Sequence, residues 1–371
     1  MEKIIEQINY FLPSFGNRPK ELIGREEIIS HFLEGLESAP GSKERVTLFL
    51  GQRGYGKTVI LLELAELAKQ NGFIIASPTV VSNDMQDIII EKIQEEGEKL
   101  LKSPRSKLVG GNIGFLGFSA GLQFEREEKE TKSFRYKLSK LCTAINEYDK
   151  GVLILVDEVQ ANDENLKSLV IAYQELVGEG RNIAIAMAGV PGAISGLLND
   201  HVLTFLNRAT KVEIGPLLYG DINAYYNKAF KDMNLNLGDE LIAQAAKATE
   251  GSPYLMQLIG YYIYKFASND GKISDEEFFK AIKVSREQYI NDICKTIVSG
   301  LSDVDIKFLV AMGADEKTSK ITEIAKRMAV TPDYAPKYKK RLLDSGVITR
   351  VRRGEVEYAV PYLKEYLDNE E

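Results

Sequence analysis

Residues 51–58 read Gly51-Gln52-Arg53-Gly54-Tyr55-Gly56-Lys57-Thr58, which satisfies every fixed position of G-x-x-x-x-G-K-[ST]. The β-branched and aromatic run Val46–Leu50 precedes this stretch and predicts a buried strand. Thr58–Gln70 follows it and has apolar residues at helical spacing, which predicts a helix. Between a strand and a helix, glycines let backbone N–H groups turn inward around phosphate oxygens, and the helix start adds partial positive charge. The stretch therefore predicts a phosphate-binding loop.

The side chains of this loop have distinct expected roles. Lys57 would neutralise the β- and γ-phosphates of ATP, and the Thr58 hydroxyl would bind Mg²⁺. Arg53 is expected to face solvent rather than to take part in catalysis. We expect the nucleotide contacts of this segment to come from Gly51, Gln52, Arg53, Gly54, Tyr55, Gly56, Lys57, Thr58 and Val59.

A second acidic motif completes the predicted site. The apolar strand Val152–Val156 runs directly into Asp157 and Glu158. Ligands of open α/β sheets bind at the carboxyl ends of the strands, where this pair would lie. Asp157 would hold Mg²⁺ either directly or through a bound water, and Glu158 would polarise the attacking water. ATP and Mg²⁺ are thus the predicted cofactors, and Lys57 and Glu158 are predicted catalytic groups of an ATPase.

The rest of the chain predicts three parts. Strands alternate with helices over residues 1–215, which indicates an α/β fold with a parallel sheet and a glycine-rich β-hairpin inserted at 107–125. The following residues, 216–300, contain only helical patterns. Residues 301–371 contain short helices and then an alternating hairpin at Val347–Val360. This last pattern is typical of a winged helix-turn-helix domain.

Bulk composition excludes several classes of protein. The 371 residues carry a formal net charge of −7, so any nucleic-acid surface must be a local patch. Two cysteines and two histidines, far apart in the chain, predict no structural zinc and a reduced, cytoplasmic protein. No apolar run reaches the roughly 18–20 residues needed to cross a bilayer, so no membrane partner is expected.

The two acids after the strand resemble those of AAA+ ATPases, which keep a catalytic Glu beside the Mg²⁺-binding Asp. The segment Ile23-Gly24-Arg25-Glu26-Glu27-Ile28 resembles the "GRE" segment of Orc/Cdc-type replication-initiator ATPases. The resemblance implies that Ile23 and Gly24 help to form the adenine pocket. It also implies the order P-loop domain, helical lid and C-terminal winged helix.

Two departures from that family affect the expected activity. The strand Ile183–Ala188 continues into Gly189-Val190-Pro191, where the family usually has a polar side chain that senses the γ-phosphate. The segment Gly251-Ser252-Pro253-Tyr254 has a Gly-x-Pro turn, which resembles signal-transducing P-loop ATPases of the STAND type. We therefore expect slow turnover and switch-like behaviour.

The family resemblance also draws attention to Arg208, just before the last predicted strand. In relatives, an arginine near this point reaches the ATP of a neighbouring subunit, which predicts a homo-oligomer and a catalytic arginine finger. A surface arginine that caps the strand is the equal alternative.

Basic residues cluster in the C-terminal part. Residues 337–353 contain seven Lys or Arg and one Asp, whereas residues 301–371 contain 13 of each charge. One basic face shared by a helix and a wing suits contacts with the phosphates of duplex DNA. The predicted DNA contacts are Lys339, Lys340, Arg341, Arg350, Arg352 and Arg353. A solvated basic face on a protein-binding winged helix is the alternative.

Three functions remain open from the sequence. The first is a DNA-binding AAA+ ATPase of initiator or mobile-element type, whose nucleotide acts as a switch. The second is a STAND-like signalling ATPase whose winged helix binds protein. The third is a binding module that holds ATP without hydrolysing it.

Overall fold

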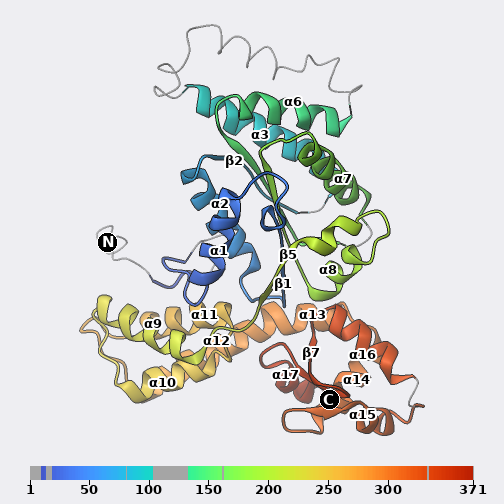
Figure 1. Cartoon of the computed structure of the whole chain (residues 1–371). Helices are drawn as coiled ribbons and strands as arrows, with labels where there is room; N and C mark the ends of the chain where they lie inside the picture. The colour runs from blue at the N-terminus through green and yellow to red at the C-terminus, as the bar shows by residue number, and fades with distance from the viewer. Residues whose placement is uncertain are drawn as a thin grey trace.

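The structure is a computed structural model that describes residues 10–13, 19–80, 82–102, 133–160, 163–331 and 334–370. The hairpin predicted at 107–125 lies outside these ranges. The chain forms an α/β part, a helical region beneath it and a C-terminal module beside that region (Figure 1). None of the helices in the described ranges has the length and apolarity that crossing a bilayer requires.

A five-stranded parallel sheet forms the centre of the α/β part. Its strands lie in the order β2-β3-β4-β1-β5, so the two strands with predicted site residues are separated only by β4. Their bounds are β1 Val46–Gly51, β2 Phe73–Val80, β3 Gly151–Asp157, β4 Ile183–Gly189 and β5 Thr210–Ile214. The predicted parallel sheet is confirmed, and its order places the ends of β1 and β3 at one edge.

Helices cover both faces of the sheet. α1 and α2 pack on one face, where Phe49, Ile75 and Leu153 point, and the other helices cover the face of Leu48 and Ile154. This alternation along each strand is the period-two pattern of a sheet buried on both sides. The helices are α1 Glu26–Glu37, α2 Lys57–Gln70, α3 Met85–Lys102, α6 Phe134–Asn146, α7 Glu164–Gly178 and α8 Pro191–Leu198.

The helical region follows the last strand of the sheet. Its helices are α9 Tyr219–Asp232, α10 Asp239–Ala248, α11 Pro253–Phe266 and α12 Asp275–Tyr289. α12 continues through a π-helix, Ile290–Cys294, into α13 Lys295–Ser299. The sequence predicts one helix here, and the structure adds the π-helical turn, which periodicity does not reveal.

The C-terminal module, residues 303–370, combines short helices with a small antiparallel sheet in the order β6-β8-β7. Its elements are α14 Asp303–Gly313, β6 Ser319–Lys320, α15 Ile321–Arg327, α16 Ala335–Asp344, β7 Ile348–Arg352, β8 Glu355–Tyr358 and α17 Leu363–Glu370. The hairpin β7–β8 falls within the predicted Val347–Val360.

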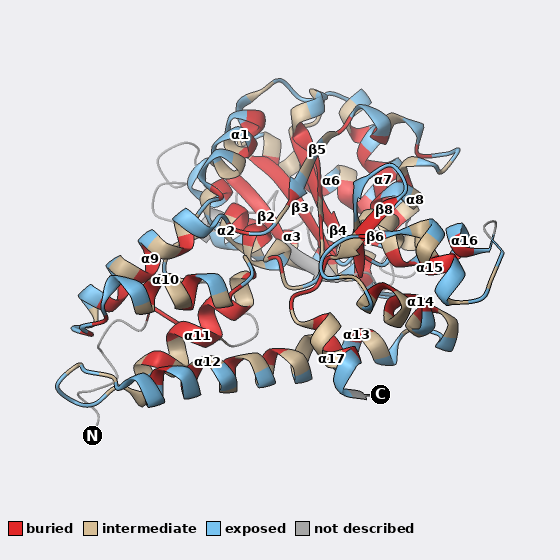
Figure 2. Ribbon diagram, turned by 90° about the horizontal axis from the view of Figure 1, so that it is seen from below, coloured by how far each residue is buried: buried red, intermediate tan, exposed pale blue. Residues whose placement is uncertain are grey.

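One hydrophobic core runs from the helical region into the C-terminal module. It includes Phe230 and Leu258 of the former and Phe308 and Leu342 of the latter, joined through Tyr289. In the view from below, buried residues lie along α11 and on the side of α12 that faces it (Figure 2). The two parts are therefore packed as one apolar unit rather than as separate cores.

The N-terminal residues 10–13 pack into this same core through Tyr10 and Phe11. A substitution at Gly260 can test this packing. A Cβ at Gly260 of α11 would overlap the ring of Phe11, which is fully buried. Alanine normally stabilises a helix over glycine, but overpacking a filled core costs about 1–3 kcal/mol. We predict that Gly260→Ala lowers the free energy of unfolding by about 1–2 kcal/mol in urea denaturation.

Gly178, the last residue of α7, provides the matched control for this prediction. Nothing lies within 4 Å of a Cβ placed there. Gly178→Ala should thus leave stability unchanged or slightly higher. Equal stability of Gly260→Ala and the wild type would show that residues 10–13 do not pack on α11 as described.

Candidate nucleotide-binding site

The loop between β1 and α2 has the backbone geometry that phosphate binding requires. Gly54 and Gly56 adopt φ of +80° and +83°, a left-handed conformation that glycine adopts without steric cost. Gly56 directly precedes the first residue of α2, so the amides at the helix start face the same space as the loop. The loop therefore forms an anion-binding concavity at the edge of the sheet.

Lys57 lies inside this concavity. Its Nζ donates to the carbonyl oxygens of Gly51 at 2.9 Å and Gln52 at 2.8 Å. Burial lowers the pKa of Lys57 to about 8, although the nearby carboxylates of Asp157 and Glu158 oppose that shift. The ammonium group is thus partly desolvated, which strengthens its attraction for phosphate oxygens.

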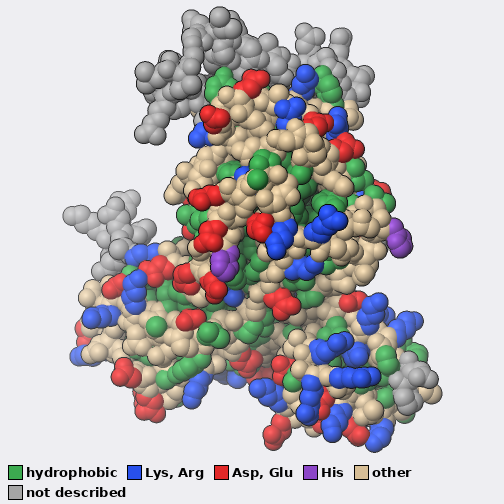
Figure 3. Space-filling model, viewed as in Figure 1, with side chains coloured by type: hydrophobic (Ala, Val, Ile, Leu, Met, Phe, Trp, Pro, Cys, Tyr) green, Lys and Arg blue, Asp and Glu red, His purple; other side chains and the backbone are tan. Residues whose placement is uncertain are grey.

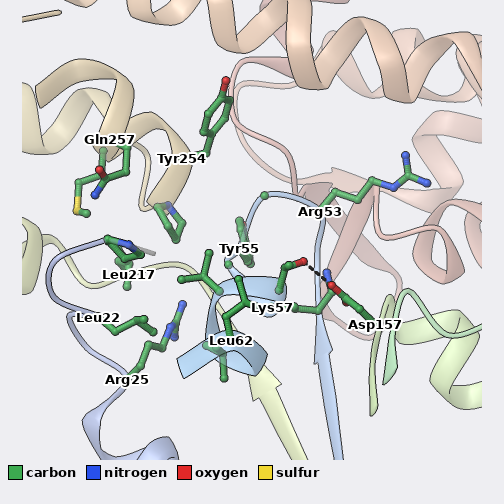
Figure 4. Close-up of a pocket in the computed structure, with 18 of the residues that line it drawn as sticks. Leu22, Arg25, Arg53, Tyr55, Lys57, Leu62, Asp157, Leu217, Tyr254 and Gln257 are labelled. Carbon is green, nitrogen blue, oxygen red and sulfur yellow. Dashed lines mark hydrogen bonds between the residues drawn. The ribbon is translucent and has the colours of Figure 1, made fainter. Parts of the chain in front are cut away.

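The predicted metal ligands meet across the sheet edge. Thr58 Oγ1 donates to Asp157 Oδ2 at 2.5 Å, drawn as the dashed line in Figure 4. Asp157 is 4% exposed, and its Oδ1 accepts the backbone N–H of Glu158 at 2.9 Å. One hydroxyl and one carboxylate suit Mg²⁺, which commonly takes one or two protein oxygens and completes its shell with water and phosphate. The described residues contain no cluster of three or more metal-binding side chains, so phosphate oxygens would have to supply further ligands.

Glu158 is held in an unusual backbone conformation. Its φ is +50°, in a region that non-glycine residues rarely adopt, and its neighbour Val159 is fixed by a hydrogen bond to Ala188 at 3.0 Å. The side chain is exposed and borders the same cavity as Lys57. Strain of this kind persists where the surrounding structure imposes it, and it is common at functional sites.

A cavity of about 940 Å³ extends from the phosphate loop toward the helical region. Most of the loop residues predicted for the site line it, among them Tyr55 and Lys57 (Figure 4). Ile23 also lines it. Gly51, Gln52 and Gly24 do not line it, although the first two supply the carbonyls that hold Lys57. Arg53 is exposed and extends away from Lys57, as the sequence predicts.

The far end of the cavity is largely apolar and was only partly predicted. Its walls come from three distant segments, and they suit a flat heteroaromatic ring better than a phosphate. The lining residues there include Leu12, Leu22, Ile23, Leu217 and Met256. The sequence predicted only Ile23 in this set, because single apolar residues give no sign that folding brings them together.

Arg25 is a buried cation in this wall that the sequence did not assign to the site. It is 8% exposed and donates to the backbone carbonyl of Gly215, which follows β5. Burial lowers its pKa from the ordinary value, and the charge of Asp221 opposes that shift. Arg25 thus connects the start of α1 with the segment that leads into the helical region.

The end of β4 lies between Lys57 and Asp157, and it carries no polar side chain. A Cβ at Gly189 would come within 2.5 Å of Val159 Cγ2, so even alanine does not fit without movement. The strand order makes this the place from which a residue of β4 would approach the γ-phosphate. The lack of a polar side chain at the end of β4, already evident in the sequence, therefore has a steric basis.

Arg208 lies outside the cavity. It ends the 3-10 helix Thr204–Arg208 and is exposed, and it does not line the space around Lys57. Within one chain it therefore does not contact the candidate nucleotide site.

The predicted DNA contacts lie on α16 and on the hairpin β7–β8, and the structure divides them into two groups. Arg341 pairs with the buried Asp305, and Arg352 pairs with Glu355 at 2.6 Å. Lys340, Arg350 and Arg353 are exposed, and Lys339 is half-buried. Lys and Arg side chains gather over this module in Figure 3. Arg341 and Arg352 thus have structural partners that the sequence analysis did not identify.

The fold is similar to solved structures of nucleotide-dependent proteins. The Walker-type ATPase PABY2304 of Pyrococcus abyssi aligns with a TM-score of 0.70 and 17% identity, over 95% of this chain and 97% of that one. The ORC2 protein of Aeropyrum pernix, solved as ADPNP–ADP complexes, aligns with a TM-score of 0.61 and 13% identity, over 96% of each chain. Its ADP form gives a TM-score of 0.54.

Similarity found from the sequence covers a smaller part of the chain than the structural similarities do. A family model described as a domain of unknown function (DUF8462) matches residues 291–367, and no curated protein sequence matches the chain. The structural similarities confirm, at the level of the fold, the resemblance to AAA+ ATPases of the Orc/Cdc type.

Proposed function

We propose that this protein binds ATP with Mg²⁺, hydrolyses it slowly and uses the bound nucleotide to control a DNA-binding C-terminal module. One observation supports the nucleotide site above all: the side chains of Lys57, Thr58, Asp157 and Glu158 lie together at one end of a cavity. An ammonium group, two metal-binding oxygens and a carboxylate are the groups that phosphoryl transfer to water needs.

The chemical roles follow from the positions of the side chains. Lys57 would leave the two loop carbonyls for the β- and γ-phosphates, while Thr58 and Asp157 would hold Mg²⁺, which would offset the charge of the phosphates. Glu158 would accept a proton from the attacking water. The apolar wall around Ile23 and Leu217 would hold the base. The lack of a polar side chain at Gly189 supports slow turnover.

Arg208 would act only between subunits. Its exposure outside the cavity suits a role as an arginine finger toward the nucleotide of a second copy, and such a group can contribute roughly 10³–10⁵ in rate.

The C-terminal module would bind duplex DNA as a winged helix. The order α14-β6-α15-α16-β7-β8, with a helix pair followed by a hairpin, supports this assignment. Lys339 and Lys340 of α16 and Arg350 and Arg353 of the wing would contact phosphates. Arg341 and Arg352 could join them only by sharing or leaving their carboxylate partners.

A STAND-like signalling ATPase is the second candidate. Pro253 of the Gly-x-Pro turn lines the cavity, and Gly251 has a φ of +76° in that turn. In this function the basic module would bind protein, and DNA binding would be weak and insensitive to the wing.

Lys57→Ala is predicted to lower ATP affinity by at least about a hundredfold. Removing one partner of a buried charge pair costs about 2–5 kcal/mol, and 1.4 kcal/mol corresponds to tenfold. Equilibrium binding of ATP with Mg²⁺ measures the effect. Lys69→Ala, at the other end of α2, is the control and should bind as the wild type does. Wild-type affinity in Lys57→Ala would reject the nucleotide site.

Glu158→Gln is predicted to retain ATP binding and to lose turnover by about 10²–10⁴-fold, the usual contribution of a general base. The amide keeps the size of the side chain but is a poor proton acceptor. Single-turnover hydrolysis measures the rate, and Glu164→Gln at the start of α7 is the control. An unchanged rate in Glu158→Gln would exclude Glu158 as the base, and an inactive wild type would favour ATP binding alone.

Replacing Lys340, Arg350 and Arg353 together with Ala is predicted to weaken duplex DNA binding for all sequences. Each lost phosphate contact should also reduce the log–log salt slope by about 0.9. The control replaces Lys231, Lys247 and Lys280 of the helical region, which removes the same charge from another surface. Equal weakening by both triples would show that net charge, not this face, attracts DNA.

A further inference from the structure

The phosphate loop contacts the C-terminal module as well as the cavity. Tyr55, inside the loop, has a buried ring, and its hydroxyl donates to the backbone carbonyl of Ala359 at 3.0 Å. Ala359 in turn donates to Val347 at 3.0 Å, which ties this carbonyl to the hairpin of the module. Burial raises the pKa of Tyr55, so the hydroxyl remains a proton donor. A residue of the nucleotide loop is therefore bonded to a segment 304 residues away.

A second loop residue makes closer contact with the module. A Cβ placed on Gly346 would overlap Oε1 of Gln52, and Gly346 has a φ of +74°. Gln52 Oε1 is buried without a hydrogen-bond partner among the described residues. The turn after α16 thus lies directly against the Gln52 side chain, which would have to move if residue 346 carried a Cβ.

The module also touches the segment that follows β4. A Cβ at Gly192 of α8 would overlap the backbone of Asp344, the last residue of α16. The module thus contacts the α/β part at two residues of the phosphate loop, Gln52 and Tyr55, and at Gly192 of α8.

The π-helix joins these contacts to the helical region. Ile293 lines the nucleotide cavity, and the next residue, Cys294, lies within hydrogen-bond distance of Pro361, with 3.4 Å between Sγ and the carbonyl oxygen. Tyr254, which also lines the cavity, donates to Asp292 at 2.7 Å. π-helical turns are rare and occur often at functional sites. One turn of helix here faces the cavity on one side and the C-terminal module on the other.

We propose that the phosphate loop is itself the docking surface of the C-terminal module, so that ATP binding and module docking stabilise each other. This inference rests on the nucleotide site of the proposed function. The docked module holds the loop in the conformation with Gly54 and Gly56 left-handed, which is the one that cradles phosphates. Two ligands that stabilise the same conformation bind with positive coupling, and the coupling is equal in both directions.

Gly346→Ala tests the coupling from the module side, because every residue of the nucleotide site stays unchanged. The added methyl group would displace the Gln52 side chain from its place against the module and so break this contact. We expect ATP with Mg²⁺ to bind roughly fivefold more weakly or worse, at the lower end of usual coupling energies. Gly354→Ala is the matched control, since Gly354 lies in the same module with a φ of +85° and nothing within 4 Å.

The two glycine variants separate contact from backbone strain. Alanine is strained at both positions, so Gly354→Ala reports the cost of strain alone and should keep an ATP affinity close to that of the wild type. A folded Gly346→Ala protein with wild-type ATP affinity overturns the proposal. Equal weakening in both variants also overturns it, because the contact with the loop would then be irrelevant.

Hydrogen exchange of the full-length protein gives a second readout. A non-hydrolysable ATP analogue with Mg²⁺ should slow exchange of the amides at 347–359 in the wild type. Gln52→Ala removes the side chain beside Gly346 and should reduce that protection. This variant can be measured even if Gly346→Ala does not fold. Unchanged protection in Gln52→Ala rejects the coupling.

These measurements distinguish two kinds of failure. If the wild type binds ATP and Lys57→Ala does not, but the analogue leaves exchange at 347–359 unaltered, the nucleotide site stands and the coupling is wrong. If Lys57→Ala binds ATP as well as the wild type, the nucleotide site itself is wrong.

Discussion

The contact between Thr58 and Asp157 is the constraint on which the rest of the site depends. Thr58 lies in the first turn of the helix after β1 and Asp157 ends β3, so their 2.5 Å hydrogen bond spans a sheet in which β4 lies between the two strands. Parallel strands end at the same edge, and their side chains can meet only if register and order are both correct. The register pairs β1 with β4 and β4 with β3, which brings the loop, the acids and the cavity together.

The site combines charges that would be unfavourable in isolation. Burial lowers the pKa of Lys57 to about 8, and the two carboxylates nearby oppose this shift. A partly desolvated ammonium group is attracted strongly to a polyanion, because no large hydration shell must be removed at the moment of binding. Glu158 adds local strain through its φ of +50°. A bound phosphate group would offset the desolvation of the Lys57 ammonium group.

The sequence predicted the phosphate end of the site well, because its information is local. Gly51–Thr58 and Asp157-Glu158 are contiguous motifs whose residue types follow from the chemistry of phosphate and Mg²⁺. The base end could not be predicted as fully. Leu12, Leu217 and Met256 are ordinary apolar residues, and only the fold places them in one wall.

Long-range pairing limited the predictions for the C-terminal module in the same way. Arg341 lies on a basic helix and fits a phosphate contact by position and charge. Its partner Asp305 is 36 residues away and fully buried, so nothing near Arg341 in the sequence indicates the ion pair. Arg352 and Glu355 are three residues apart, and this pair was within reach of a charge-pattern argument. The contacts of Gln52 and Tyr55 with the module had no signal in the sequence.

The continuous core explains why a contact at the phosphate loop can matter beyond it. Phe230, Tyr289 and Phe308 belong to one apolar cluster, so α9–α13 and the C-terminal module cannot separate without exposing buried surface. The module is thus fixed to the helical region and touches the α/β part at the loop and at α8. A change in the loop would therefore act on the whole unit rather than on one hairpin. Since Ile293 faces the cavity from the helix that joins the two parts, a bound nucleotide would lie against this helix as well as against the phosphate loop.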